Sequence, residues 1–119
     1  VQGEPDPRWP CRPDVRAGLA AVAREGLVYD LLTLPVQLPA AIETVRALPE
    51  LQFVVDHISK PPIAIGELEP WATQIRELAA HDHVACKLSG MVTEAARAGR
   101  SPACARTRRS CWMPSARPG

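Results

Sequence analysis

Three short apolar runs stand out along the first part of the chain. They cover residues 27–32, 52–57 and 84–88, and they are rich in β-branched residues. A continuous apolar run of this length is typical of a strand whose two faces are both buried. The pattern therefore predicts three buried strands.

Each predicted strand is preceded by a segment with the periodicity of an amphipathic helix. These segments begin near Pro13, Pro39 and Pro70, and proline suits the first turn of a helix. Apolar residues recur at intervals of three and four within each segment, so that each helix has one apolar face. The faces consist of Val15, Leu19, Val22 and Ala23 in the first helix, Ile42, Val45 and Leu48 in the second, and Leu68, Trp71, Ala72, Ile75, Leu78 and Ala79 in the third.

The alternation of helix and strand predicts an α/β fold with parallel strands. The loops that follow the first two strands, around Pro35 and over residues 59–66, are longer and richer in proline than the loops that precede the strands. In parallel α/β folds the functional residues gather at the carboxyl ends of the strands. We therefore expect the functional site at that end.

The alternation stops after Ala95, where the charge also changes sign. Residues 1–95 hold 8 Lys and Arg against 13 Asp and Glu, whereas residues 96–119 hold 6 Arg and no acid. This tail of Arg, Ala, Pro and Ser has no apolar periodicity, which predicts disorder. We favour the interpretation that it is read out of frame, and a genuine basic tail is the alternative.

The composition excludes several classes of protein. No stretch approaches the ~20 apolar residues that cross a bilayer, and the N-terminus has acids and prolines where a secretory signal has basic residues, which predicts a cytoplasmic protein. The cysteines form no C-x-x-C pair, so we expect free thiols. Because the sequence begins with Val1, we also expect a longer reading frame.

Four segments, in unbroken order, resemble strand ends of amidohydrolase-related proteins, and most of all those of the L-fuconolactonase and L-rhamnono-lactonase type. They are residues 1–6, 27–32, 54–61 and 86–94. The most specific pieces are Asp56-His57-x-x-Lys60-Pro61 and Cys86-Lys87-Leu88-Ser89-Gly90. The resemblance covers residues 1–95.

This resemblance implies part of a (β/α)8 TIM barrel, about strands four to seven, in which Val1-Gln2 ends the fourth strand. It also implies a hydrolase whose intact fold holds a divalent metal such as zinc in some relatives. In the family, a His-x-His pair on the first strand and an Asp on the eighth complete the site, and this sequence contains neither segment. Whether this chain is itself an enzyme is therefore left open, and we expect it to be incomplete alone.

His57 is the first candidate for catalysis, because an imidazole at the end of an apolar strand can bind a metal or transfer a proton near neutral pH. The resemblance implies that it is a metal ligand or polarises a carbonyl. The alternative is a structural histidine bonded to a backbone carbonyl. Asp56 alternates to the other side of the strand, where we expect it to bond to an amide.

Asp30 is the second catalytic candidate, because a carboxylate within an apolar run needs a partner or a function. Its alternative is an Asp satisfied by backbone donors or by an Arg. Lys60 follows the His57 strand and could bind a substrate carboxylate or hydroxyl, or could be an exposed loop lysine. Lys87 and Ser89 alternate onto one face, which we expect to point inward and to bind substrate. Gln2 is assigned to substrate binding by the resemblance.

Two other features are set aside. His81-Asp82-His83 has the spacing of a metal pair, but it precedes its strand and belongs to the opposite end. Cys86 is interpreted as a small hydrophobe and not as a nucleophile.

The function predicted for the intact protein is hydrolysis of sugar-acid lactones, in which an activated water attacks the ester carbonyl. The expected partner is a small-molecule sugar lactone, with no membrane. Self-association could cover the edges of an open half barrel. The alternative is a non-enzymatic interaction protein that uses its Arg-rich tail, but the tail lacks aromatic residues interleaved with the arginines, so we do not expect a nucleic-acid partner.

Overall fold

The three apolar runs form the strands of one parallel sheet in a computed structural model of the chain, which describes residues 1–95. β1 (Val28–Leu31), β2 (Gln52–Val55) and β3 (Val84–Cys86) lie in the order β1-β2-β3. The prediction of parallel strands in an α/β fold is confirmed. Each strand is shorter than its apolar run, and β2 ends before Asp56 because the backbone turns there.

The predicted helices are confirmed to within one or two residues. α1 (Pro13–Arg24), α2 (Leu38–Ala47) and α3 (Trp71–Ala79) precede β1, β2 and β3 respectively, and a short α4 (Met91–Glu94) follows β3. Short 3-10 turns η1 (Trp9–Cys11), η2 (Pro35–Gln37), η3 (Asp56–Ser59) and η4 (Ile63–Ile65) lie in the connections. Among the described residues no helix is long and apolar enough to span a membrane.

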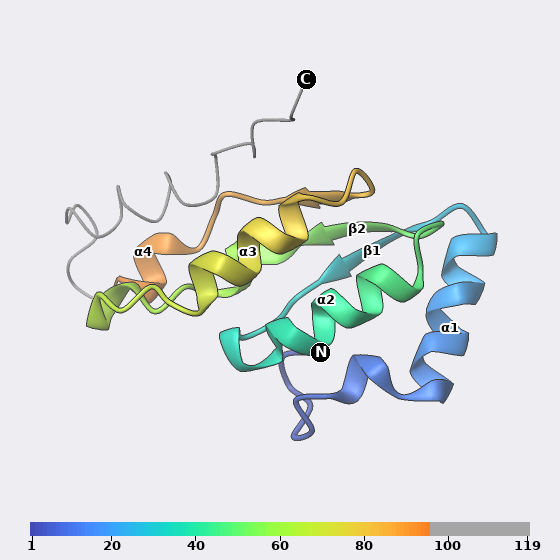
Figure 1. The fold of residues 1–119 in the computed structure, drawn as a ribbon, viewed down its shortest axis with the longest axis horizontal. Helices are drawn as coiled ribbons and strands as arrows, with labels where there is room; N and C mark the ends of the chain where they lie inside the picture. Colours follow the sequence, from blue (N-terminus) through green and yellow to red (C-terminus); the bar gives the residue numbers. More distant parts are fainter. Residues whose placement is uncertain (96–119) are drawn as a thin grey trace.

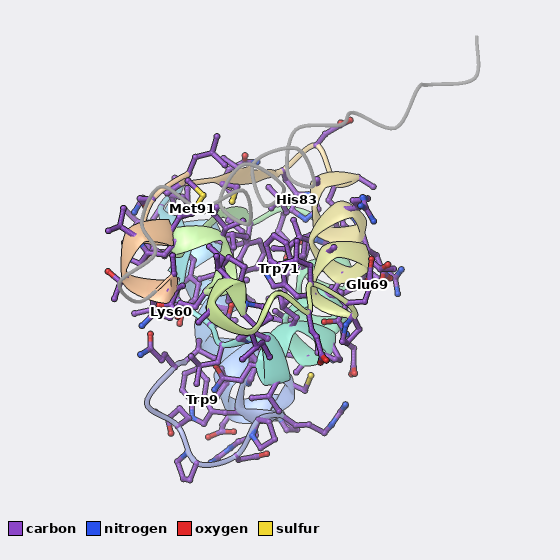
Figure 2. All side chains as sticks on the ribbon, turned by 90° about the vertical axis from the view of Figure 1, so that its left-hand side faces the viewer. Trp9, Lys60, Glu69, Trp71, His83 and Met91 are labelled. Carbon is purple, nitrogen blue, oxygen red and sulfur yellow. The ribbon has the colours of Figure 1, made fainter. Side chains whose placement is uncertain are left out.

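The helices cover one face of the sheet. Figure 1 shows α2 and α3 lying in front of β1 and β2, with α1 beside them and the strands pointing toward the side that carries α4. The predicted apolar faces point into this layer, although Ala79 is exposed. The largest buried side chains between sheet and helices include Phe53, Leu31, Val45 and Trp71. Figure 2 views the molecule from the end at which the strands finish and shows Trp71 near its middle.

The strand register separates the two faces of the sheet. Leu31 pairs with Val55 and both are buried beneath the helices, whereas Asp30, one position earlier, is exposed on the opposite face. Val28 is 55% exposed on that same face. The face away from the helices is therefore open, and it carries both polar and apolar side chains.

Candidate active site

Four of the six predicted site residues come together at the carboxyl ends of the strands. Asp30 lies in β1, His57 follows β2, and Lys87 and Ser89 follow β3. Hydrogen bonds or ion pairs join side chains from all three strand ends. Because parallel strands place their carboxyl ends at one edge, a site assembled there draws on distant parts of the sequence.

Lys87 is held between two carboxylates. Its Nζ lies 3.1 Å from Asp30 Oδ2 and 2.6 Å from Asp56 Oδ1. Asp56, and then Asp30, raise the pKa of Lys87 above its ordinary value. The ammonium group therefore stays protonated at neutral pH, which suits a cation that binds or orients a substrate oxygen and excludes a general base.

Asp56 lies in the site, although the sequence pattern predicted it on the other side of the strand. Its side chain is 14% exposed and contacts Lys87 from the same face as Asp30. Val55 pairs with Cys86, so Asp56 follows the parity of Val54 and comes beside Lys87. The prediction was wrong because it assumed that His57 and Asp56 alternate, whereas Asp56 keeps the parity of the strand and the left-handed turn after it redirects His57 to the same face.

His57 reaches the site through an unusual backbone. Four consecutive residues, from His57 to Lys60, have φ between 50° and 54°, in the left-handed region. For residues other than glycine this conformation costs roughly 1–2 kcal/mol each, so surrounding contacts must hold it. The turn redirects His57, which would otherwise follow the parity of Val55 and point toward the helices.

Buried contacts fix this left-handed turn. The Ile58 side chain is fully buried, and its carbonyl accepts a 2.8 Å hydrogen bond from Trp71 Nε1. The buried hydroxyl groups of Ser59 and Thr33 lie 2.6 Å apart, which ties the turn to the end of β1. Sequence periodicity indicated that Trp71 was core, but it could not show these polar contacts.

The imidazole of His57 is bonded to Ser89. His57 Nδ1 lies 2.8 Å from Ser89 Oγ, across the gap between β2 and β3. With Nδ1 occupied, Nε2 is the ring nitrogen left to meet a ligand or a substrate. Neutral imidazole can there donate or accept a proton, or polarise a carbonyl group.

Lys60 and Gln2 occupy the edges of this region. Lys60 ends the left-handed turn and is half-buried, on the outer part of the molecule in Figure 2. The backbone N–H of Gln2 donates a 2.9 Å hydrogen bond to the carbonyl of Leu32, just past β1. The buried Oε1 of Gln2 has no hydrogen-bond partner within residues 1–95. Gln2 is thus beside the strand ends, whereas its predicted role and that of Lys60 stay predictions.

His83 and Cys86 were both set aside as functional residues in the sequence analysis. The structure gives a separate reason for each. His83 Nε2 is 3.2 Å from the carbonyl of Val45, at the start of β3. Burial raises the pKa of the Cys86 thiol to about 11, even though the residue has exposed surface along β3. Its thiolate is therefore scarce at neutral pH, which argues against a nucleophile.

The described residues do not by themselves fit zinc. No group of three His, Cys, Asp or Glu side chains able to hold a metal ion occurs within residues 1–95. His57 offers one imidazole nitrogen, and the carboxylates of Asp30 and Asp56 pair with Lys87. A catalytic zinc needs about three protein ligands, so residues 1–95 supply at most part of such a site, and the role of His57 as a metal ligand stays a prediction.

Comparison with protein families gives a match over most of the chain. A model of the amidohydrolase family matches residues 1–112, a span that includes every candidate site residue and runs past Ala95. The tail after Ala95 lies outside the described residues, so its predicted disorder and reading frame stay predictions.

Two curated relatives are lactonases. The chain is 42% identical over 95 residues to an L-fucono-1,5-lactonase from Burkholderia ambifaria, an alignment that covers 80% of this chain and 33% of the relative. It is 39% identical over 87 residues to an L-fucono-1,5-lactonase from Burkholderia multivorans, covering 69% of this chain and 29% of that protein. The chain spans about a third of the length of these curated relatives.

Solved structures show the same likeness. A crystal structure of an amidohydrolase from Burkholderia multivorans with bound zinc matches with a TM-score of 0.79 and 36% identity, covering 92% of this chain and 40% of that chain. An amidohydrolase 2 from Bifidobacterium longum subsp. infantis matches with a TM-score of 0.61 and 26% identity, covering 70% of this chain and 32% of that one.

Proposed function

Because the chain belongs to the amidohydrolase family, we propose that it is a segment of a hydrolase that opens lactones of sugar acids. The observation that carries this proposal is the 42% identity to an L-fucono-1,5-lactonase over 95 residues. The convergence of Asp30, His57, Lys87 and Ser89 at the strand ends supports it. Nothing in the comparisons supports the alternative of a non-enzymatic protein that acts through its basic tail.

We further propose that residues 1–95 supply about strands four to seven of a (β/α)8 barrel. β1, β2 and β3 would be the fifth, sixth and seventh strands, and Val1-Gln2 the end of the fourth. The hydrogen bond from Gln2 N–H to the Leu32 carbonyl supports this arrangement, because it places Gln2 beside the end of β1. On this proposal the open face of the sheet lines the barrel interior, where residues at strand ends meet the substrate.

In the proposed reaction, water attacks the ester carbonyl of the lactone, and the ring opens to a hydroxy acid. His57 Nε2 donates a hydrogen bond to the carbonyl oxygen, which stabilises the negative charge that develops there. Asp30, whose Oδ2 is paired with Lys87, has a second carboxylate oxygen with which to accept the proton of the attacking water. The proton must finally reach the ring oxygen that leaves.

The lysines and Gln2 are assigned to the substrate and not to proton transfer. The Lys87 ammonium group can donate to a lactone oxygen while Asp30 and Asp56 hold it in place. Lys60 and Gln2 border the site and are proposed to contact sugar hydroxyl groups.

A chimeric enzyme tests this function. Residues 1–95 would replace the matching segment of the Burkholderia ambifaria L-fucono-1,5-lactonase, so that the other segments of the enzyme come from the relative. We expect the folded chimera to hydrolyse L-fucono-1,5-lactone faster than a simple δ-lactone without hydroxyl groups. A folded chimera that opens neither lactone, while the parent enzyme opens the first, would refute the proposal.

A further inference from the structure

Three features of the structure fix the position of the His57 ring. Its backbone lies in the left-handed turn, its Nδ1 contacts Ser89 Oγ at 2.8 Å, and its Cβ and ring pack against Gly90. A Cβ added to Gly90 would lie 2.9 Å from His57 Cβ, closer than such atoms approach, and 3.3 Å from Nδ1, which is also a tight contact. The φ of +74° at Gly90 also favours glycine.

The direction of the hydrogen bond between Ser89 and His57 determines which nitrogen of the neutral imidazole is protonated. If Nδ1 donated to Ser89 Oγ, the hydroxyl proton would need a second acceptor, and the structure shows none for it within residues 1–95. If the hydroxyl group donates to Nδ1, both groups are satisfied by one bond. A half-buried hydroxyl group favours the arrangement in which its proton is bonded.

We propose that Ser89 is a positioning residue, whose hydroxyl group donates to His57 Nδ1 and so holds the neutral imidazole with its proton on Nε2. Gly90 leaves the space that this ring orientation needs. The hydrogen bond that one ring nitrogen makes sets the proton on the other.

This inference deepens the proposed function and rests on it for its catalytic meaning. An imidazole that contacts a carbonyl oxygen polarises it as a hydrogen-bond donor, so His57 must present N–H at Nε2 and not a lone pair. The geometry of Ser89 would supply that state before substrate binds, which lowers the cost of orienting the ring in the transition state.

Nuclear magnetic resonance of the ring nitrogens tests the proposal without any need for activity. The full chain of 119 residues is labelled with ¹⁵N-histidine and measured at a pH at which His57 is neutral, with signals assigned through His57→Gln. We expect the His57 proton on Nε2 and an Nδ1 signal displaced by an accepted hydrogen bond. A proton on Nδ1 in the wild-type chain would overturn the proposal directly.

Variants then identify the donor. Ser89→Ala should move the Nδ1 signal to the position of a nitrogen without a hydrogen bond, whereas Ser89→Thr, which keeps a hydroxyl group, should retain the displaced signal. Thr93→Ala removes an exposed hydroxyl group in α4 and serves as the matched control. An unchanged Nδ1 signal in Ser89→Ala would overturn the assignment of Ser89.

The chimera separates this inference from the proposed function. There we expect Ser89→Ala to lower kcat by about 10- to 100-fold with little change in KM, and Ser89→Thr to restore most of it. A chimera without lactonase activity that keeps the bonded Nδ1 refutes the function and supports the positioning contact. An active chimera in which Ser89→Ala changes neither kcat nor Nδ1 refutes the positioning role alone.

Discussion

Two glycines differ in what a methyl group would meet, and this difference predicts opposite effects of the same substitution. Gly90→Ala places its Cβ against His57 at a φ of +74°, which should lower the free energy of unfolding by about 1–3 kcal/mol. Gly18 lies in α1, where an added Cβ meets no atom within 4 Å. Gly18→Ala should therefore raise the free energy of unfolding by about 0.5–1 kcal/mol. Urea unfolding measures both, and equal effects would contradict the packing of Gly90 on His57.

The ion pairs of Lys87 predict that the stability of the fold changes with pH in the alkaline range. Asp56 and Asp30 raise its pKa in the folded chain above the ordinary value of 10.5. A group whose pKa rises on folding stabilises the fold below its unfolded pKa and loses that contribution as the pH passes its folded pKa. The difference in unfolding free energy between wild type and Lys87→Met should therefore be constant near neutral pH and shrink above pH 10.5.

The control for this experiment is Lys87→Arg, because an arginine keeps its charge across the same range. The stability of this variant relative to Lys87→Met should not shrink over the same pH interval. If the difference in unfolding free energy between wild type and Lys87→Met stays constant through the alkaline range, Lys87 does not stabilise the fold through Asp56 and Asp30.

The sequence was enough to select most residues of the candidate site, but not all of them. Residue type and place on a strand were enough to select Asp30, His57, Lys87 and Ser89, and the structure brings these together. Asp56 was missed because simple alternation cannot foresee where a strand ends. Aligning Val54-Val55-Asp56 with Ala85-Cys86-Lys87 as parallel neighbours would have placed the carboxylate beside the lysine. The catalytic and binding roles of the selected residues stay predictions.

At the scale of elements, Trp71 connects α3 to the turn that carries His57. Trp71→Phe removes the donor to the Ile58 carbonyl and leaves a small cavity, which should cost about 2–4 kcal/mol of unfolding free energy. Trp9→Phe is the control, because Trp9 is only half-buried and should change stability by less than about 1 kcal/mol. Guanidinium unfolding compares the two, and a Trp71 variant as stable as the Trp9 variant would contradict this bracing role.

The helices and strands could be predicted well because their signals are local. Apolar spacing and proline positions place α1, α2 and α3 to within a residue or two. The left-handed turn from His57 to Lys60 could not be predicted, because no glycine marks it. It depends on contacts with Trp71 and Thr33, which are distant in sequence.

At the scale of the whole molecule, the open face of the sheet predicts association between copies of the chain. Val28 is 55% exposed there, and Ala85, which pairs with Val54 on the same face, is exposed as well. Exposed apolar surface beside unpaired strand edges favours contact with another chain. Sedimentation velocity should show species larger than a monomer that increase with concentration.

A charge on the open face should reduce this association. Val28→Lys should shift the chain toward the monomer without unfolding it, whereas Val36→Lys, at a residue 67% exposed in η2 and away from the sheet, should not. Equal sedimentation of the two variants would argue against the sheet face as the contact.

The sequence predicted the family and the parallel α/β order of the molecule, and the comparisons confirm the family. The closed barrel stays a proposal, because the chain spans 40% of a matching solved structure.

The most direct test of the central claim, that this segment carries lactone-opening chemistry centred on His57, is the kcat/KM of the lactonase chimera with and without that imidazole. We predict that His57→Gln lowers kcat/KM for L-fucono-1,5-lactone by at least about 100-fold. We expect His81→Gln, at the opposite end of the sheet, to change it by less than about threefold. If the folded His57→Gln chimera keeps its activity, or if both histidine variants lose it equally, His57 is not the centre of the site and the account is wrong.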